Sequence, residues 1–291
     1  MEKTEESLSG ELVGWRRIAD AWPSPTHHGQ ICIQLELDAR PLLRFMRSAA
    51  VRHCAVRPAH LVGRAVAYAL GAVPALNVRF AGHRVIRRDS VDIFFTVATS
   101  GGAGLTGLRI TDAMNKGALD IADELRRRAE WVAAGEDPFG RAKRLANRLP
   151  RPILRAGLRA AEWLASSRAM PLSWLGLTAM PFGSAIVTDM EALGFPGLAP
   201  SASVRWSPLH IVVGAIVDRP VVVSGRVEVQ PTMPLTLTAD AHYAAPTRFV
   251  EGLQAMQSYL ADPEAFEPAW GVIPIQAQRD VRPKLRMTVP A

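Results

Sequence analysis

Hydrophobic and polar residues alternate over residues 30–38, QICIQLELD, which is the pattern of a strand with one buried face. A helix is expected to follow, from residue 40 to residue 53. Pro58 then opens a second helix that is apolar on most of its faces, so it is expected to lie deep in the core. Apolar residues spaced three and four apart after Gly117 predict an amphipathic helix that Gly135 ends.

The remainder of the chain continues this mixture of strands and helices. Strand patterns recur in GSAIVTD, HIVVGAIV, PVVVSGRVEVQ and PLTLTAD, and a last helix is expected from about Pro246. Because strands and helices interleave throughout, the sequence predicts an α/β sandwich. Residues 1–10 are expected to be a disordered tail, residues 11–262 the folded domain, and residues 263–291 an irregular tail.

The composition is that of a soluble globular protein, with 48% hydrophobic and 21% charged residues among 291. No run of 18 apolar residues occurs, and the acidic start MEKTEESLSGE lacks the regions of a secretory signal. Two cysteines, Cys32 and Cys54, are too few for a disulfide framework. Both are expected to be buried thiols in a reducing cytoplasm.

The net charge of +7 is concentrated in residues 139–177, where Glu162 is the only acidic residue. Eight basic residues lie there: Arg141, Lys143, Arg144, Arg148, Arg151, Arg155, Arg159 and Arg168. The rest of the chain is formally neutral, which argues against a general nucleic-acid-binding protein. The charge instead indicates one local basic element, predicted to be two helices broken at LPRP.

Common catalytic and cofactor motifs are missing from the sequence. It contains no GxxxxGK[ST], no GxGxxG after a strand, no HExxH and no GxSxG. His27 and His28 are adjacent, which makes a poor metal site because neighbouring side chains of an extended chain point apart. No metal is therefore expected.

The order of the segments resembles the catalytic domain of the 2-oxo acid dehydrogenase acyltransferases. RPAHLVGRAVAYALGAVPALN, with its P-x-L-N junction at Pro74–Asn77, is the most specific match, and FGSAIVTDMEALG and SPLHIVVGAIVDRPVVV follow in the family's order. The resemblance covers roughly Leu12 to Leu260. It implies a chloramphenicol acetyltransferase-like fold, a two-layer α/β sandwich with a mixed sheet, carrying a basic helical insertion at residues 139–177.

The resemblance implies an acyltransferase that moves an acyl group from a coenzyme A thioester to a thiol or hydroxyl acceptor. In the family a histidine of a His-x-x-x-Asp-Gly motif is the general base, and a hydroxyl from the facing subunit of a trimer stabilises the oxyanion. Thr188, in VTD, matches the position of that hydroxyl. Asp189 and Glu191 depart from the family pattern there, and a nearby carboxylate would oppose a developing oxyanion.

The histidine motif is altered in LTADAHYAAPTRF. Aligned from the left, the catalytic histidine falls on Ala241, and aligned from the right, His242 falls on the Asp of Asp-Gly. Two interpretations stay open. His242 is the base of a working acyltransferase with a shortened loop, or the chain is an inactive trimeric scaffold or partner subunit that keeps the fold alone. A paralogous subunit could also complete the site.

The resemblance also sets expectations for the surroundings of the domain. No lipoyl domain precedes it in the chain, so a stand-alone member or one subunit of a larger assembly is expected, in the cytoplasm or at the membrane periphery. Three roles stay open for residues 139–177: a packed helical hairpin whose arginines pair with acidic neighbours, a contact with an anionic membrane or lipid, and a contact with a partner subunit or the coenzyme A phosphates.

Overall fold

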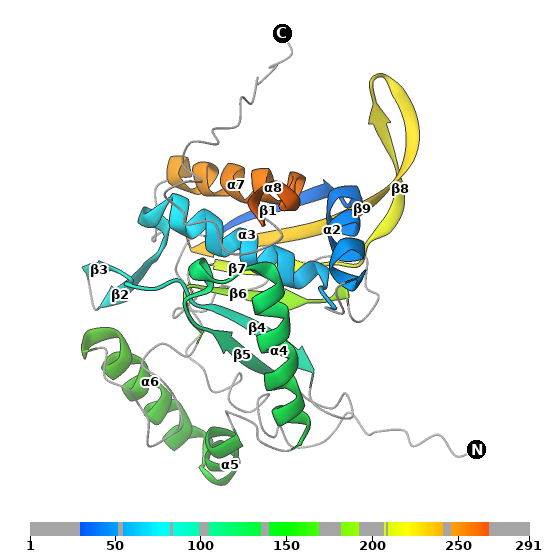
Figure 1. Cartoon of the computed structure of the whole chain (residues 1–291). Helices are drawn as coiled ribbons and strands as arrows, with labels where there is room; N and C mark the ends of the chain where they lie inside the picture. The colour runs from blue at the N-terminus through cyan, green and yellow to red at the C-terminus, as the bar shows by residue number, and fades with distance from the viewer. Residues whose placement is uncertain are drawn as a thin grey trace.

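A mixed β-sheet forms one layer of the protein, and helices cover one of its faces (Figure 1). The computed structural model describes residues 30–51, 55–81, 84–98, 105–134, 140–168, 182–191, 207, 209–240 and 246–267. The main sheet has seven strands. Along the sheet they are β1 (Gln30–Asp38), β9 (Arg226–Asp240), β7 (Leu209–Val213), β6 (Ala185–Asp189), β4 (Ile93–Ala98) and β5 (Leu105–Ile110), while β8 (Val217–Val223) pairs with β9.

The centre of the sheet is parallel and its flanks are antiparallel. Strands β4, β6 and β7 run in the same direction, whereas β5, β9 and β1 run against their neighbours. A separate two-stranded sheet consists of β2 (Val78–Ala81) and β3 (Arg84–Arg87). The predicted α/β sandwich with a mixed sheet is confirmed.

Four longer helices and three short ones build the second layer in the described part of the chain, one of the short ones being the 3₁₀ turn η1 (Pro74–Leu76). The others are α2 (Arg40–Val51), α3 (Pro58–Ala72), α4 (Ala118–Ala133), α7 (Pro246–Ala261), the single turn α8 (Pro263–Phe266) and the 3₁₀ turn η2 (Ala113–Asn115). Helix α3 lies at the centre of this layer, and nearly all of its residues are buried, as its apolar sequence predicts (Figure 1). At Gly63 a Cβ atom would lie 2.3 Å from the ring of Phe95 on β4, so the glycine permits this close approach of helix and sheet.

A buried ion pair joins α3 to the end of the folded chain. Arg64 has no exposed surface, and its Nε donates a 2.8 Å hydrogen bond to Glu267, whose other oxygen accepts a 2.7 Å bond from the amide of Ala118. The guanidinium also lies over the ring of Tyr259, 5.8 Å from its centroid. Burial raises the pKa of Glu267, and the positive charge of Arg64 opposes this rise. One ion pair therefore fastens α3, α4 and α7 together.

The strands and tail near the end of the chain differ in three places from the sequence-based expectation. PVVVSGRVEVQ is a hairpin and not one strand, because Ser224 and Gly225 both have positive φ and form the two-residue turn between β8 and β9. Strand β9 then runs unbroken past two prolines. The tail expected to be irregular from residue 263 begins with the turn α8, which packs into the core through Phe266.

The two prolines of β9 are tolerated because each lies just outside one of the ladders that the strand forms. Pro231 precedes the stretch paired with β1, and Pro234 lies between the stretches paired with β8 and with β7. A proline at such a position removes few ladder hydrogen bonds.

Cys32 is exposed, so the expectation of a buried thiol is wrong for this residue. Its strand, β1, turns Ile31 and Ile33 toward the helices, and alternation places Cys32 on the other face. Cys54 lies outside the described residues.

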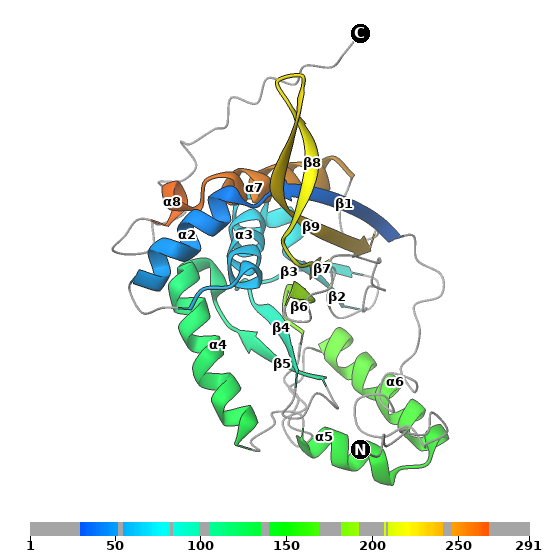
Figure 2. The same cartoon turned by 90° about the vertical axis from the view of Figure 1, so that its right-hand side faces the viewer.

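The basic segment forms two helices, as predicted, α5 (Gly140–Arg148) and α6 (Arg151–Arg168). They lie beyond the edge of the sheet, away from the main helical layer (Figures 1 and 2). Ala146 and Leu154 are buried between them, with Leu149 and Leu158 packed alongside. Exposed arginines without an ion pair to any described residue are Arg144, Arg148, Arg155 and Arg159. The expected pairing of these four arginines with acidic neighbours is therefore not found in the described part of the chain.

We expect the Arg64→Met variant to lose about 3–5 kcal/mol of unfolding free energy, because Glu267 would remain buried without its partner. Urea unfolding at a fixed protein concentration measures this loss. The matched control is Arg126→Met on α4, where an exposed arginine pairs with Asp123 and Glu130; it should lose less than about 1 kcal/mol. Equal losses in the two variants would contradict the role given to the buried pair.

Candidate functional site

The face of the sheet that points away from the helices carries the candidate site. Strand alternation turns Ala185 and Val187 of β6 into the helix-covered core, so Ile186 and Thr188 lie on the opposite face. On the neighbouring strand β7, Leu209 and Ile211 face the core and His210 does not. Threonines share this second face on β4 and β9, namely Thr96, Thr236 and Thr238. This second face, called the polar face below, thus carries Thr188 among other hydroxyls and beside the apolar Ile186 and Val212.

Thr188 and His210 meet on this polar face. Thr188 Oγ1 lies 3.0 Å from His210 Nε2, a normal hydrogen-bond distance, and both side chains are half-buried. Sequence reasoning identified Thr188 and missed His210. The available signal was a histidine within the otherwise apolar strand LHIVV, at a position that alternation places opposite Leu209 and Ile211.

The beginning of β6 is fixed by a buried hydrogen-bond network. Ser184 Oγ donates a 2.7 Å bond to Oδ1 of Asn77, and the amide of Ser184 donates a 2.7 Å bond to the carbonyl of Asp92. Gly183 has a φ of +64° and approaches the Asp92 carbonyl so closely that a Cβ atom would lie 2.4 Å from its oxygen. Only glycine fits this position without strain. Asn77, the last residue of the P-x-L-N junction, thus sets the start of the strand that carries Thr188.

The end of β6 is fixed by Arg57, the residue that precedes α3. Its guanidinium lies 2.9 Å from a carboxylate oxygen of Asp189 and 2.9 Å from one of Glu191. Alternation places Asp189 on the helix face, opposite Thr188. The expected repulsion between this carboxylate and an oxyanion at Thr188 is therefore wrong, because Asp189 lies on the other face of the sheet and its charge is paired.

His60, in the first turn of α3, supports the position of Arg57. Its Nδ1 accepts a 3.1 Å hydrogen bond from the backbone amide of Arg57, and its ring meets Phe95 edge to face. Burial and, to a lesser degree, the positive charge of Arg57 lower the pKa of His60 from 6.5 to about 4. His60 is therefore neutral at physiological pH, as its role as an acceptor at Nδ1 requires.

The predicted base, His242, lies outside the described residues, as do His27 and His28. The described part of the chain ends at Asp240, the last residue of β9, and resumes at Pro246 in α7. The role of His242 as the general base therefore stays a prediction.

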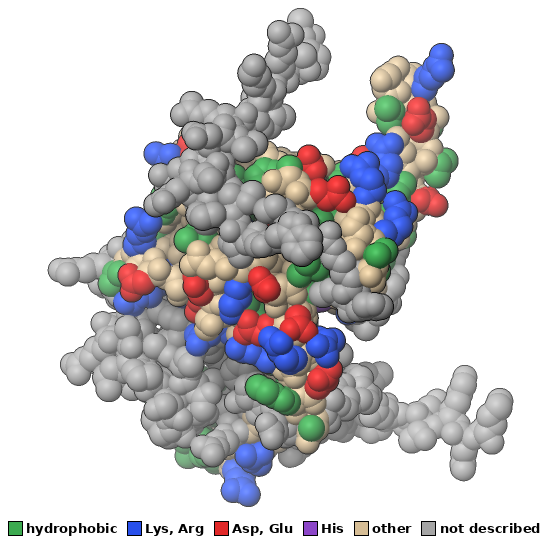
Figure 3. Space-filling view, in the orientation of Figure 1, with side chains coloured by type: hydrophobic (Ala, Val, Ile, Leu, Met, Phe, Trp, Pro, Cys, Tyr) green, Lys and Arg blue, Asp and Glu red, His purple; other side chains and the backbone are tan. Residues whose placement is uncertain are grey.

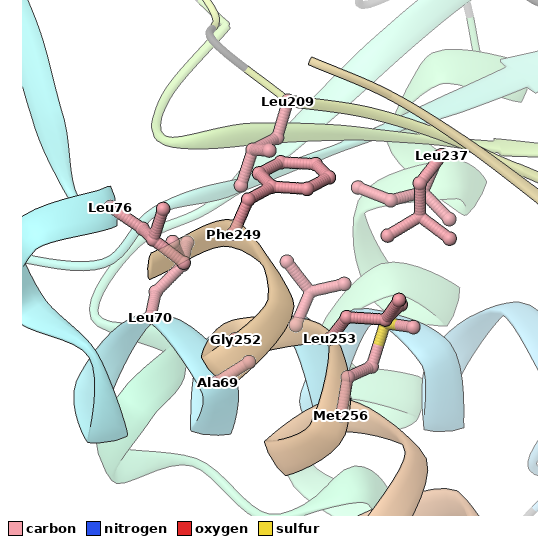
Figure 4. Close-up of a pocket in the computed structure, with 11 residues that line it drawn as sticks. Ala69, Leu70, Leu76, Leu209, Leu237, Phe249, Gly252, Leu253 and Met256 are labelled. Atoms are coloured by element: carbon pink, nitrogen blue, oxygen red, sulfur yellow. The ribbon is translucent and has the colours of Figure 1, made fainter. Parts of the chain in front are cut away.

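A small apolar cavity lies on the helix side, between α3, α7 and the sheet, with about 350 Å³ of empty space including its opening to solvent (Figure 4). Leu70, Leu237, Phe249 and Met256 are among its walls, and α7 approaches Leu76 closely at Gly252. The described lining residues are all apolar, so the cavity offers no group that could move a proton or bind a charge. Its position on the opposite side of the sheet from Thr188 separates it from the polar face.

The described residues contain no group of three or more histidine, cysteine, aspartate or glutamate side chains arranged to hold a metal ion. None of the described helices is both long enough and apolar enough to cross a membrane.

Comparison with known proteins agrees with this architecture. Residues 23–136 match the model of the 2-oxoacid dehydrogenases acyltransferase (catalytic domain) family. That segment of the chain is similar to the acyltransferase catalytic domains of this family. No curated protein matches the chain by sequence. Solved structures similar to the chain over more than four fifths of its length have less than 20% sequence identity with it, so they show the likeness of the fold.

Three solved structures illustrate the likeness. A dihydrolipoamide acetyltransferase of Azotobacter vinelandii, studied for the catalytic role of a serine, a histidine and an asparagine, has 17% identity and a TM-score of 0.62 over 91% of this chain and 98% of that one. The cubic core of a pyruvate dehydrogenase multienzyme complex has 18% identity and a TM-score of 0.61 over the same shares. Chloramphenicol acetyltransferase has 12% identity and a TM-score of 0.50 over 84% and 93%. The chloramphenicol acetyltransferase-like fold is thereby confirmed.

We expect the stability of the protein to fall as the pH is lowered from about 6.5 to about 4. In that window His60 is protonated in the unfolded chain and stays neutral in the folded chain, because its pKa is lower in the folded state. Proton uptake therefore favours unfolding and lowers the free energy of unfolding by up to roughly 3 kcal/mol at pH 4. The His60→Asn variant keeps an acceptor near Nδ1 and does not titrate. Its unfolding free energy should change less over this window than that of the wild type, by urea unfolding at each pH. Parallel pH profiles for the two proteins would show that His60 is not buried as described.

Proposed function

We propose that the chain is an acyltransferase that moves an acyl group from a coenzyme A thioester to a thiol or hydroxyl acceptor. The observation that carries the proposal is the position of Thr188: a half-buried hydroxyl on a central strand, on a polar sheet face, within the fold of acyltransferase catalytic cores. A hydroxyl held in this way can donate its proton to the oxyanion that forms when a thioester carbonyl is attacked.

The proposed reaction needs a base for the acceptor, and His242 is the candidate. The acceptor thiol or hydroxyl loses its proton to His242 and attacks the thioester carbon. The tetrahedral oxyanion is stabilised by Thr188, and its collapse releases the coenzyme A thiolate, which takes the proton back from His242. The relative from Azotobacter vinelandii, studied for the catalytic role of a serine and a histidine, supports this pairing of a hydroxyl with an imidazole.

The site is completed, in this proposal, by assembly of several copies of the chain into a trimer or a larger core. The hairpin of β8 and the first half of β9 supports such an assembly, since it extends from the body of the protein as an arm (Figure 2). Val222 and Val227 are cross-strand partners and Val229 follows on the same face, and each of the three is 73–74% exposed. Exposed valines gathered on one face of a projecting hairpin are typical of a surface that another chain covers.

We expect Thr188→Val to lower kcat for acyl transfer about 100-fold, because the oxyanion loses its donor, while Thr188→Ser keeps the hydroxyl and stays within about tenfold of the wild type. His242→Ala should lower kcat at least about 100-fold. Release of coenzyme A from acetyl coenzyme A, with a dithiol as acceptor, is the measurement. Unchanged transfer by His242→Ala would remove the histidine from the mechanism.

Calorimetric titration of the assembled wild type with coenzyme A separates this enzyme from the inactive scaffold. The enzyme binds coenzyme A and transfers acyl groups. A confirmed oligomer that does neither would be the scaffold or a partner subunit, as the loss of Asp-Gly after His242 would then indicate.

We expect the triple variant Val222→Thr, Val227→Thr, Val229→Thr to weaken assembly at least about tenfold, because it removes methyl groups from the contact and keeps the β-branched shape that the hairpin needs. Sedimentation velocity over a range of protein concentrations measures this change. The matched control is Val250→Thr, a valine of α7 that is 48% exposed, which should assemble like the wild type. Assembly that is unaffected by the triple variant would place the contact elsewhere.

A further inference from the structure

The hydrogen bond between Thr188 and His210 raises the question of which group donates. A threonine hydroxyl has one proton, whereas a neutral imidazole donates from one nitrogen and accepts at the other. If Thr188 donates to His210, its only proton is used and no oxyanion can receive it. If His210 Nε2 donates to Thr188 Oγ1, the hydroxyl proton is left for a second acceptor.

No other described side chain competes for the hydroxyl of Thr188. Its neighbours in the same row of the sheet are Thr96 on β4 and Val212 on β7, and the hydrogen bond recorded for its hydroxyl is the one to His210. Beside His210 lies Thr238 on β9, whose buried hydroxyl has no hydrogen-bond partner among the described residues. His210 is therefore the group that sets the direction of the Thr188 proton within the described part of the chain.

The geometry points to His210 as a positioning residue: its Nε2–H donates to Thr188 Oγ1 and directs the hydroxyl proton of Thr188 toward the oxygen that becomes negative during acyl transfer. This inference rests on the proposed function and adds to it a residue from the same chain. Thr188 and His210 lie on adjacent parallel strands with fixed register. Their hydrogen bond restricts the rotation of the Thr188 hydroxyl. The hydroxyl is then already oriented before the transition state forms, which is how preorganised donors lower the activation free energy.

The tautomer of His210 tests the inference without any measurement of activity. In the full chain labelled with ¹⁵N-histidine, long-range ¹H–¹⁵N spectra should show His210, assigned by its loss in His210→Gln, as the neutral Nε2–H form. Its Nε2 signal should shift in Thr188→Val and stay nearly in place in Thr188→Ser. The matched control is Thr238→Val, which removes the neighbouring hydroxyl that makes no hydrogen bond, and should leave the signal nearly in place.

Kinetics supply the second readout. His210→Ala should lower kcat about tenfold or more with KM changed less than about threefold, and His210→Gln, which keeps an N–H donor, should restore most of the loss. In a Thr188→Val background, His210→Ala should have no further effect, because the two residues act as a unit. Thr238→Val should transfer acyl groups at nearly the wild-type rate.

The outcomes separate the two proposals. A His210 protonated on Nδ1, with Nε2 accepting from Thr188, overturns the inference whether or not the protein transfers acyl groups. The inference is also overturned if His210→Ala lowers kcat by the same factor in the wild type and in the Thr188→Val background. A wild type that shows the Nε2–H form coupled to Thr188 but transfers no acyl group would overturn the proposed function, and with it the catalytic use of the pair.

Discussion

The hydrogen bond from Ser184 to Asn77 is the contact on which the position of the candidate site depends most directly. Strand β6 has five residues, and alone it would be too short to hold its register firmly. The bond fixes its first end in a buried place where an unpaired amide or hydroxyl would be costly. The Asn77 amide donates in turn to the Ser90 carbonyl, so the junction after α3 also holds the approach to β4.

The same segment of chain fixes the other end of β6. Helix α3 has 15 residues and is therefore about 22 Å long, close to the span of β6 and the residues that flank it. Arg57, just before this helix, binds Asp189 and Glu191, and Asn77, just after it, binds Ser184. Helix and strand consequently run in opposite directions and are joined at both ends. The buried Arg64–Glu267 pair then holds the helix itself against α4 and α7.

Much of the fold could be predicted from the sequence because the signals were local. Strand β1 follows from strict alternation, and the buried α3 follows from its apolar faces and Pro58. The hairpin turn at Ser224 and Gly225 was missed because the flanking valines continue a strand pattern on both sides. Contacts such as Arg64 with Glu267 link residues 203 positions apart, and no local pattern signals such a pair.

Of the two residues that meet at the candidate site, one could be predicted from a local sequence pattern and the other could not. Thr188 was found by its place in a motif. His210 was not, because its meaning depends on two strands being neighbours in the sheet and in one register. Strand geometry also explains why the carboxylate of Asp189 does not oppose an oxyanion at Thr188. In sequence Asp189 is adjacent to the hydroxyl, but in a strand adjacency means opposite faces.

The sheet therefore separates two kinds of chemistry. On the helix side lie the paired charges of Arg57, Asp189 and Glu191 and the neutral His60, which together hold the strand in place. On the other side, the described neighbours of Thr188 are hydroxyls, one imidazole and the apolar Ile186 and Val212, and the carboxylate of Glu36 on β1 is paired with Arg219. An oxyanion forming at Thr188 would meet the hydroxyl of Thr188 on its own face, and the sheet would separate it from the carboxylate of Asp189. The ion pairs of Arg57 can therefore hold β6 in place without placing a carboxylate next to the hydroxyl of Thr188.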